Sequence, residues 1–198
     1  MKRYDRAYFD RWYRDPRRRV KTPADIARGA GLVIGVAEYL LGRPVRTVLD
    51  VGCGEGGWSQ ALRRVRPAVR YTGVDPSEYV VQRFGKRRNI RLGTFGALDE
   101  LELEGPFDVI ICADMLNYVP TNELVAGLRH VSSLLGGIAY MQVYASRDDV
   151  EGDRREWHDR PAARYRKLFR DAKLTACGLH CYAGKDLAPM LTALERST

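Results

Sequence analysis

The stretch VLDVGCGEGG, residues 48–57, contains a turn with four glycines and places a carboxyl group just before it. Gly52, Gly54 and Gly57 fit the pattern G-x-G-x-x-G, which lets the backbone approach a ligand and exposes the N–H groups of the following helix. In dinucleotide sites those groups bind a pyrophosphate. Asp50 would repel that anion, so the spacing favours a ligand that carries positive charge where the phosphates would lie.

The longer stretch VLDVGCGEGGWSQAL, residues 48–62, resembles motif I of the class I S-adenosylmethionine-dependent methyltransferases. S-adenosylmethionine carries an ammonium and a sulfonium group and no phosphate, which agrees with the position of Asp50. The resemblance implies that this compound is the cofactor and that Asp50 lies near its methionine part. It also implies that four turn residues line the cofactor: Gly52, Cys53, Gly54 and Gly56.

A second acidic residue follows in register, in TGVDPSEYVVQR, residues 72–83. An aspartate at the end of the second strand, here Asp75, can accept hydrogen bonds from both hydroxyls of a ribose. Asp75 and the adjacent Pro76 are therefore expected to contact the cofactor. A strand-end aspartate can also cap the next helix, and its place after motif I favours the ribose.

Two later stretches complete the resemblance. RLGTFGAL, residues 91–98, stands where the family places a loop that contacts adenine, with Thr94 and Phe95 as the expected contacts. FDVIICADMLNYVP, residues 107–120, resembles the fourth motif, a strand whose end frames the methyl group. The expected cofactor contacts there are Ala113, Asp114 and Met115.

Two residues are candidates for catalysis near the acceptor. Tyr118 follows the fourth strand and could orient an acceptor oxygen or nitrogen; the alternative is packing against the next helix. His158, in REWHDRP, follows the fifth strand, and this position makes it a candidate general base; the alternative is a solvated loop histidine. Methyl transfer needs such a base only when the nucleophile arrives protonated.

Charge and composition bear on the partner. The net charge is +8, with arginines clustered in several segments, which would suit an acidic acceptor or nucleic acid; the alternative, favoured by the acidic residues interleaved with most clusters, is a solvated basic face. A small-molecule acceptor is expected because the fourth motif lacks the Pro-Pro of methylases that act on base nitrogens and no nucleic-acid-binding domain is visible. Three alternatives stay open: a nucleic-acid methyltransferase, a nicotinamide- or flavin-dependent oxidoreductase, and a protein that binds the cofactor without catalysis.

The four cysteines do not form a metal motif. Only Cys177 and Cys181 are close, with His180 between them, and the alternation of LTACGLHCYAG predicts a strand that points the histidine away from both cysteines. No metal is therefore expected. The charged start of the chain and the absence of a long apolar run predict a cytoplasmic protein with no membrane partner.

The elements that position these residues alternate between apolar runs and helical patterns, which predicts an α/β fold. We expect a Rossmann-like, doubly wound, mostly parallel sheet of six or seven strands in the order 3-2-1-4-5, with helices on both faces. The expected strands are 47–51, 71–75, 89–93, 107–113, 137–144 and 174–183, and the end of the chain is expected to be helical. One domain, 1–198, is expected, with an N-terminal helical cap in 1–44, a cofactor-binding core in 45–145 and acceptor-side and C-terminal elements in 146–198.

The first helix of that cap carries aromatic residues at helical spacing. Tyr4, Tyr8 and Trp12 would share one face, with Tyr13 beside it, before Asp15-Pro16 ends the helix. Such a stripe can be buried packing or a lid. We expect residues 1–20 to fold over the cofactor cleft and to bring Tyr8, Trp12 or Tyr13 near the ligand.

Overall fold

A seven-stranded sheet forms the centre of the computed structural model, which describes residues 2–195. Its strands lie in the order β3-β2-β1-β4-β5-β7-β6, and all neighbours are parallel except β7, which is antiparallel to both β5 and β6. The predicted order of the first five strands is confirmed. The strands are β1 (Thr47–Val51), β2 (Arg70–Asp75), β3 (Ile90–Leu92), β4 (Phe107–Ala113), β5 (Leu135–Gln142), β6 (Thr175–Gly178) and β7 (Cys181–Ala183).

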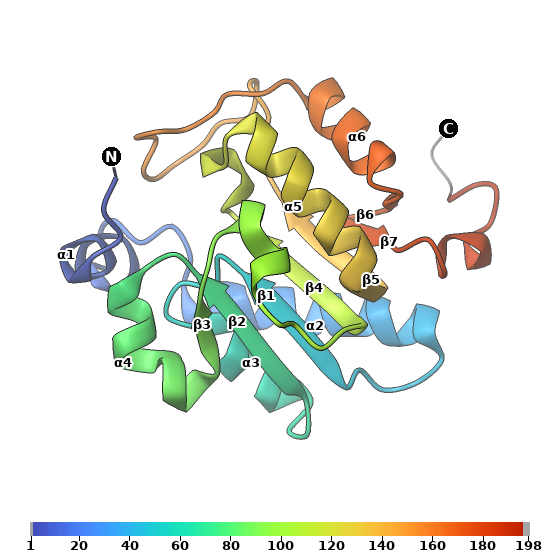
Figure 1. The fold of residues 1–198 in the computed structure, drawn as a ribbon, viewed down its shortest axis with the longest axis horizontal. Helices are drawn as coiled ribbons and strands as arrows, with labels where there is room; N and C mark the ends of the chain where they lie inside the picture. Colours follow the sequence, from blue (N-terminus) through green and yellow to red (C-terminus); the bar gives the residue numbers. More distant parts are fainter. Residues whose placement is uncertain (1, 196–198) are drawn as a thin grey trace.

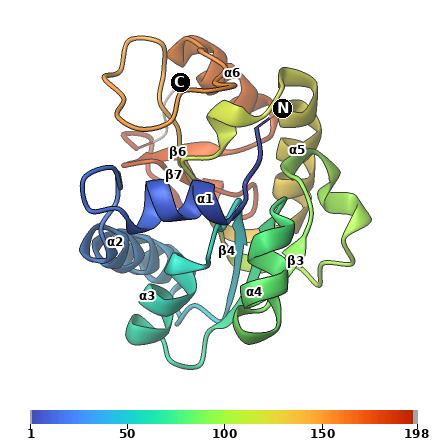
Figure 2. The ribbon, with the colours of Figure 1, turned by 90° about the vertical axis from the view of Figure 1, so that its left-hand side faces the viewer.

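Helices cover both faces of this sheet, as predicted (Figures 1 and 2). Helices α2 and α3 lie on one side, and α5 lies on the other. The α-helices are α1 (Arg6–Phe9), α2 (Pro23–Leu41), α3 (Gly57–Val65), α4 (Glu78–Arg88), α5 (Thr121–Leu134) and α6 (Ala162–Asp171). Shorter helical turns are η1 (Asp10–Arg14), η2 (Phe95–Glu100), η3 (Leu116–Tyr118) and η4 (Ala188–Met190). Within residues 2–195, none of these helices has the length and apolarity that crossing a membrane requires.

The central strand β4 shows why the sheet needs helices on both of its faces. Along β4, Val109 and Ile111 belong to one buried cluster, and Ile110 and Cys112 belong to the other. Because successive side chains of a strand point to opposite faces, a strand that is apolar throughout needs a helical layer on each side. Helices α2, α3 and α4 supply one layer, and α5 and α6 supply the other.

The end of the sheet differs from the prediction. Residues 174–183 do not form one strand, because Gly178, Leu179 and His180 all have positive φ and reverse the chain between β6 and β7. His180 therefore lies in a turn and is not on a strand face opposite Cys177 and Cys181. The helix expected after residue 184 is the short turn η4, and residues 196–198 lie outside the described residues.

The N-terminal helix is shorter and less regular than predicted. Helix α1 begins after Asp5, whose carboxylate accepts a hydrogen bond from Tyr8 N at 3.0 Å, and it continues into the π-helical turn η1. The wider turn breaks the spacing of the aromatic stripe. Phe9, at 2% exposure, is the buried ring of this segment, while Tyr8 and Trp12 are half-buried.

Candidate active site

A cavity of about 540 Å³ lies at the carboxyl ends of β1, β2 and β4. Its walls come from the turns that follow these strands, from residues 4–26 and from residues 150–157. Ligands of open α/β sheets bind at this edge. The predicted site residues that line the cavity are Tyr8, Trp12, Tyr13, Gly52, Cys53, Asp75, Pro76, Thr94, Phe95, Ala113, Asp114, Met115 and Tyr118.

The glycine turn needs its glycines for two reasons. Gly52 and Gly54 have φ of 69° and 53°, a region that favours glycine. The space of their missing side chains is also taken: a methyl group on Gly52 would lie 2.7 Å from Met115 Cγ, and one on Gly54 would lie 2.7 Å from Tyr13 Oη. Gly54 and Gly56 are not among the lining residues, and Gly56 lies against the Arg88 side chain and precedes α3.

Asp75 is held in place by the turn that it faces. Its two carboxylate oxygens accept hydrogen bonds from Gly54 N at 2.7 Å and from Ser77 N at 2.9 Å. Each oxygen keeps acceptor capacity for a ligand. Because the side chain is only 5% exposed, burial raises the pKa of Asp75 to about 6, against the two backbone hydrogen bonds that lower it.

Asp50 lies behind the cavity wall and is not among the lining residues. It is 1% exposed and accepts a hydrogen bond from Tyr71 Oη at 2.7 Å. Burial raises its pKa to about 7; the Tyr71 hydrogen bond lowers it, and the nearby charge of Asp75 raises it further. The predicted direct contact of Asp50 with the ligand therefore has no support in the cavity lining.

The predicted adenine contacts divide into an exposed and a buried residue. Thr94 is exposed, whereas Phe95 is 3% exposed and its ring packs against α5. A methyl group on Gly127 of that helix would lie 2.2 Å from Phe95 Cδ1. The ring of Phe95 therefore packs into the core, and Phe95 is also among the residues that line the cavity.

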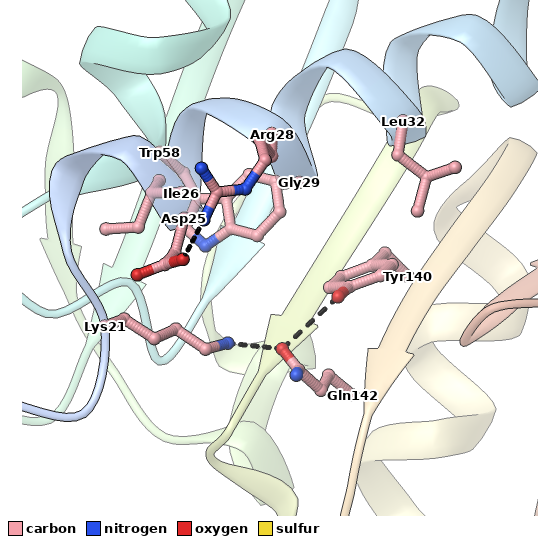
Figure 3. Close-up of a pocket in the computed structure, with 9 residues that line it drawn as sticks. All are labelled: Lys21, Asp25, Ile26, Arg28, Gly29, Leu32, Trp58, Tyr140 and Gln142. Atoms are coloured by element: carbon pink, nitrogen blue, oxygen red, sulfur yellow. Dashed lines mark hydrogen bonds and ion pairs between the residues drawn. The ribbon is translucent and has the colours of Figure 1, made fainter.

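The loop after β4 carries a charged pair. Asp114 has φ of 59°, an unusual value for a residue other than glycine, and its carboxylate forms an ion pair with Lys21. Lys21 also donates to Gln142 Oε1 (Figure 3). Lys21 lines both the main cavity and a second cavity of about 420 Å³ between α2 and β5, which Trp58 and Tyr140 also line.

The two candidate catalytic residues lie in different surroundings. Tyr118 lines the cavity, and its hydroxyl donates a hydrogen bond to the Asp153 carbonyl oxygen at 2.5 Å. Burial raises the pKa of Tyr118 above its usual range, so the hydroxyl keeps its proton. His158 is exposed and is not among the lining residues; its backbone N donates to Asn117 O at 2.7 Å. The structure thus brings Tyr118 to the cavity and leaves the imidazole of His158 outside it.

Other functional residues were not anticipated. Asn117 is fully buried and holds Tyr144, donating from its amide to Tyr144 O at 2.8 Å and accepting from Tyr144 N at 3.2 Å. Arg160 is 6% exposed and donates to the carbonyl oxygens of Leu116 and Val119. These contacts attach the segment 143–161 to the loop after β4. A buried asparagine and a buried arginine have no pattern in sequence that separates them from surface residues.

The N-terminal segment covers one side of the cavity, which we call the cap segment, residues 2–20. Helix α1 lies beside the carboxyl ends of β1 and β2 (Figures 1 and 2). Arg14 forms an ion pair with Glu55, and Ser77 Oγ donates to Tyr4 O at 2.5 Å. Phe9 stacks on Tyr79 of α4, with 5.7 Å between ring centroids. The cap segment is therefore both packed into the core and in contact with the cavity.

Comparisons with known proteins agree with this geometry. A model of the methyltransferase domain family matches residues 24–178. The magnesium-protoporphyrin O-methyltransferase of Synechocystis is 34% identical over 96 residues, 46% of this chain and 41% of that protein. The ubiquinone biosynthesis O-methyltransferase of Pseudomonas paraeruginosa is 35% identical over 103 residues, 48% of this chain and 43% of that protein. The chain thus covers less than half the length of these two curated relatives.

The fold also resembles solved structures. The structure of magnesium protoporphyrin IX methyltransferase from Synechocystis with bound S-adenosylmethionine matches with a TM-score of 0.55 and 21% sequence identity. The match covers 91% of this chain and 89% of that chain. This likeness shows that the two chains share the same fold.

Proposed function

Since the chain belongs to the family of methyltransferase domains, we propose that it transfers the methyl group of S-adenosylmethionine to a small-molecule acceptor in the cavity at the carboxyl edge of the sheet. The nicotinamide alternative has no support in this family, and Asp50 would oppose a pyrophosphate at the glycine turn. The curated relatives are named as methyltransferases of small molecules, which supports an acceptor of that class.

The observation that carries this proposal is the setting of Asp75. A carboxylate fixed by two backbone N–H groups, 5% exposed and lining the cavity, is suited to receive two neighbouring hydroxyl groups. Thr94 follows on the adenine side, and Gly52 and Cys53 follow on the methionine side. A ribose on Asp75 therefore sets the position of the whole cofactor.

We propose the same division of the chain that the sequence favoured. Residues 45–145 hold the cofactor, because Asp75, the glycine turn and the loop after β4 all belong to them. Residues 1–44 cover the cavity, with Tyr8, Trp12 and Tyr13 in its lining. Residues 146–165, held by Asn117 and Arg160, supply the acceptor wall, in which Asp153 and Trp157 take part.

The residues of this site contribute mainly by positioning. S-adenosylmethionine supplies, when bound, a methyl group activated by its sulfonium. Tyr118 keeps its proton in a hydrogen bond to Asp153 O, so its oxygen can still accept a hydrogen bond and orient an acceptor. The cap segment and the 150–157 segment exclude water from the cavity. Holding the two reactants in line contributes several kcal/mol to such a reaction.

Calorimetric titration with S-adenosylhomocysteine tests the proposal. We expect one binding site per chain, and then methyl transfer in an assay with labelled donor across phenols, amines and short RNAs as acceptors. Asp75→Asn serves as the variant that should lose binding, and Asp99→Asn, an exposed carboxyl group, serves as its matched control. A chain that binds nothing, or a variant that binds as tightly as the native chain, contradicts the proposal.

A further inference from the structure

Several residues of the cavity lining surround a cation of the protein's own, the ammonium of Lys2. The ammonium of Lys2 lies over three tyrosine rings, at 5.1 Å from the centroid of Tyr4, 5.1 Å from that of Tyr8 and 3.7 Å from that of Tyr118. Asp153 Oδ2 lies 2.8 Å from the same nitrogen. We call these three rings with Asp153 the tyrosine cage.

The tyrosine cage is part of the proposed acceptor site. Tyr4, Tyr8, Tyr118 and Asp153 all line the main cavity as well. Trp157 packs beside the cage, in an edge-to-face contact with Tyr118 at 5.2 Å between ring centroids. The side chain of Lys2 is only 4% exposed, so the cage is screened from water. Rings that surround a desolvated cation attract it through their quadrupoles.

The cage offers too few hydrogen-bond acceptors for the ammonium group of Lys2. A primary ammonium has three N–H donors, and within residues 2–195 Asp153 is the one carboxylate paired with it. The Lys2 nitrogen is buried and, among the described residues, has no hydrogen bond of good geometry. Burial lowers the pKa of Lys2, although the nearby carboxylates of Asp153 and Glu156 raise it in part. Three π faces and one carboxylate suit an ammonium whose hydrogens are mostly replaced by alkyl groups.

We propose that the tyrosine cage binds an alkylated ammonium group of the methyl acceptor, and that Lys2 occupies the cage when no acceptor is bound. This inference rests on the proposed function, because it assigns the acceptor class of the same cavity. It concerns recognition of the acceptor and leaves open which of its atoms receives the methyl group.

The local charge of this wall differs from the charge of the whole chain. The net charge of +8 would suit an acidic acceptor. Beside the cage, residues 150–157 place Glu151 and Asp153 in the cavity lining, whereas the basic lining residues belong to other segments: Arg14, Arg19, Lys21, which pairs with Asp114, and Arg88. An anionic acceptor would meet the carboxyl groups of Glu151 and Asp153 at short range, where charge acts more strongly than the average over the surface. A cationic acceptor is therefore the better complement.

The test compares choline with 3,3-dimethyl-1-butanol, which has the same shape without the charge. In the full chain with Lys2→Ala, the cage is vacated, and we expect choline to bind at least about tenfold more tightly than the neutral compound, as cation–π attraction in a desolvated site predicts. Binding is followed by calorimetry and by the fluorescence of Trp157. The control, Lys167→Ala, removes an exposed lysine elsewhere and should bind choline only as weakly as the native chain.

Further variants distinguish attraction of the cation by the tyrosine rings from binding that needs only an empty volume. In the Lys2→Ala background, Tyr118→Phe should keep choline binding within about threefold, whereas Tyr118→Leu should reduce it about tenfold, because the ring and not the hydroxyl attracts the cation. Equal binding of choline and its neutral analogue, or equal effects of Phe and Leu, would overturn the proposal. Binding of S-adenosylhomocysteine, measured on the same samples, distinguishes this failure from a failure of the proposed function.

A measurement on the native chain does not depend on the variants folding. Choline should displace the Lys2 side chain and raise the rate at which acetic anhydride acetylates it at least about threefold, read by peptide mass spectrometry against Lys167 as the internal reference. The neutral analogue should leave this rate unchanged. A Lys2 rate that choline does not alter would contradict exchange between Lys2 and the ligand.

Discussion

At the scale of single residues, the two carboxyl groups at the strand ends have different tasks. Asp75 lines the cavity, and Asp50 lies behind it and is bonded to Tyr71. The sequence could predict both, because their spacing from the glycine turn is regular and each follows a strand. It could not predict Lys2 in its cage, because that contact joins residues 2, 4, 8, 118 and 153 and depends on the tertiary fold.

Asp75→Asn should weaken S-adenosylhomocysteine binding by about 1.5–3 kcal/mol, roughly tenfold to a hundredfold, the scale of hydrogen bonds to a charged group. In the native chain the affinity should also fall as the pH drops below about 6, because the ionised form of Asp75 is the one that accepts two hydroxyl groups. Calorimetry between pH 5 and 8 measures both effects. An affinity of the native chain that is constant across this range would argue against the ribose assignment.

A separate prediction concerns the effect of Asp50 on the pH dependence of stability. Its pKa of about 7 in the folded chain lies above the ordinary value of 3.8, so its favourable contribution is present at acidic pH and is lost as the pH rises through about 7. Asp50→Asn removes the ionisable group and keeps an acceptor for Tyr71. Without cofactor, the Tm of the native chain should decline relative to that of this variant between about pH 4 and 7, the range between the unfolded and folded pKa values of Asp50. Parallel curves for the two proteins would contradict the prediction.

At the scale of elements, the alternating strands and helices were predictable, and the loops that complete the site were not. Apolar runs and their spacing predict β1, β2 and β4, because the buried strands of a parallel sheet are nearly continuous runs of apolar residues. The β6–β7 hairpin was not predicted because Leu179 and His180 adopt positive φ. This conformation is uncommon for leucine and histidine, so their presence in the sequence does not indicate a turn. The segment 143–161 has no periodicity, and buried polar contacts determine its course.

Arg160→Ala should detach this segment. The guanidinium donates to Val119 O at 2.5 Å and to Leu116 O at 3.4 Å, and its loss leaves these buried acceptors without that donor, at a cost of about 2–3 kcal/mol. Denaturant unfolding measures the loss of stability, and proteolysis within residues 146–159 should become faster. The control is Arg164→Ala, an exposed position four residues further on. If both variants behave alike, the buried arginine does not hold the segment.

At the scale of the whole molecule, the cap segment connects the two halves of the site. It contacts the glycine turn through Tyr13 and Arg14 and the acceptor wall through Lys2. The prediction that residues 1–20 fold over the cleft agrees with the cavity lining for Tyr8, Trp12 and Tyr13. The choice between lid and core could not be made from spacing; in the structure this segment lines the cavity and also packs Phe9, which is 2% exposed, into the core.

A chain without residues 1–14 should fold with a lower Tm and bind S-adenosylhomocysteine at least tenfold more weakly, since closing segments complete sites of this kind. Phe9→Ala is the comparison variant, because it removes the ring packed into the core and keeps Tyr8, Trp12 and Tyr13 in the cavity lining; by itself it should cost about 3–5 kcal/mol of stability. A truncated chain with native affinity would show that the cap segment does not take part in binding. An affinity loss fully reproduced by Phe9→Ala would assign it to packing.

The space beside Gly54 has a consequence for how this protein can evolve. Tyr13 Oη fills that space, so substitutions at positions 13 and 54 are not independent. In the intact chain Gly54→Ala meets both an unfavourable φ and the tyrosine, whereas with Tyr13→Ala only the backbone strain is left. A double-mutant cycle should therefore give a non-zero coupling energy. The two positions are thus expected to be epistatic: the loss of Tyr13 removes the steric part of the cost of a side chain at position 54, and the positive φ still favours glycine there.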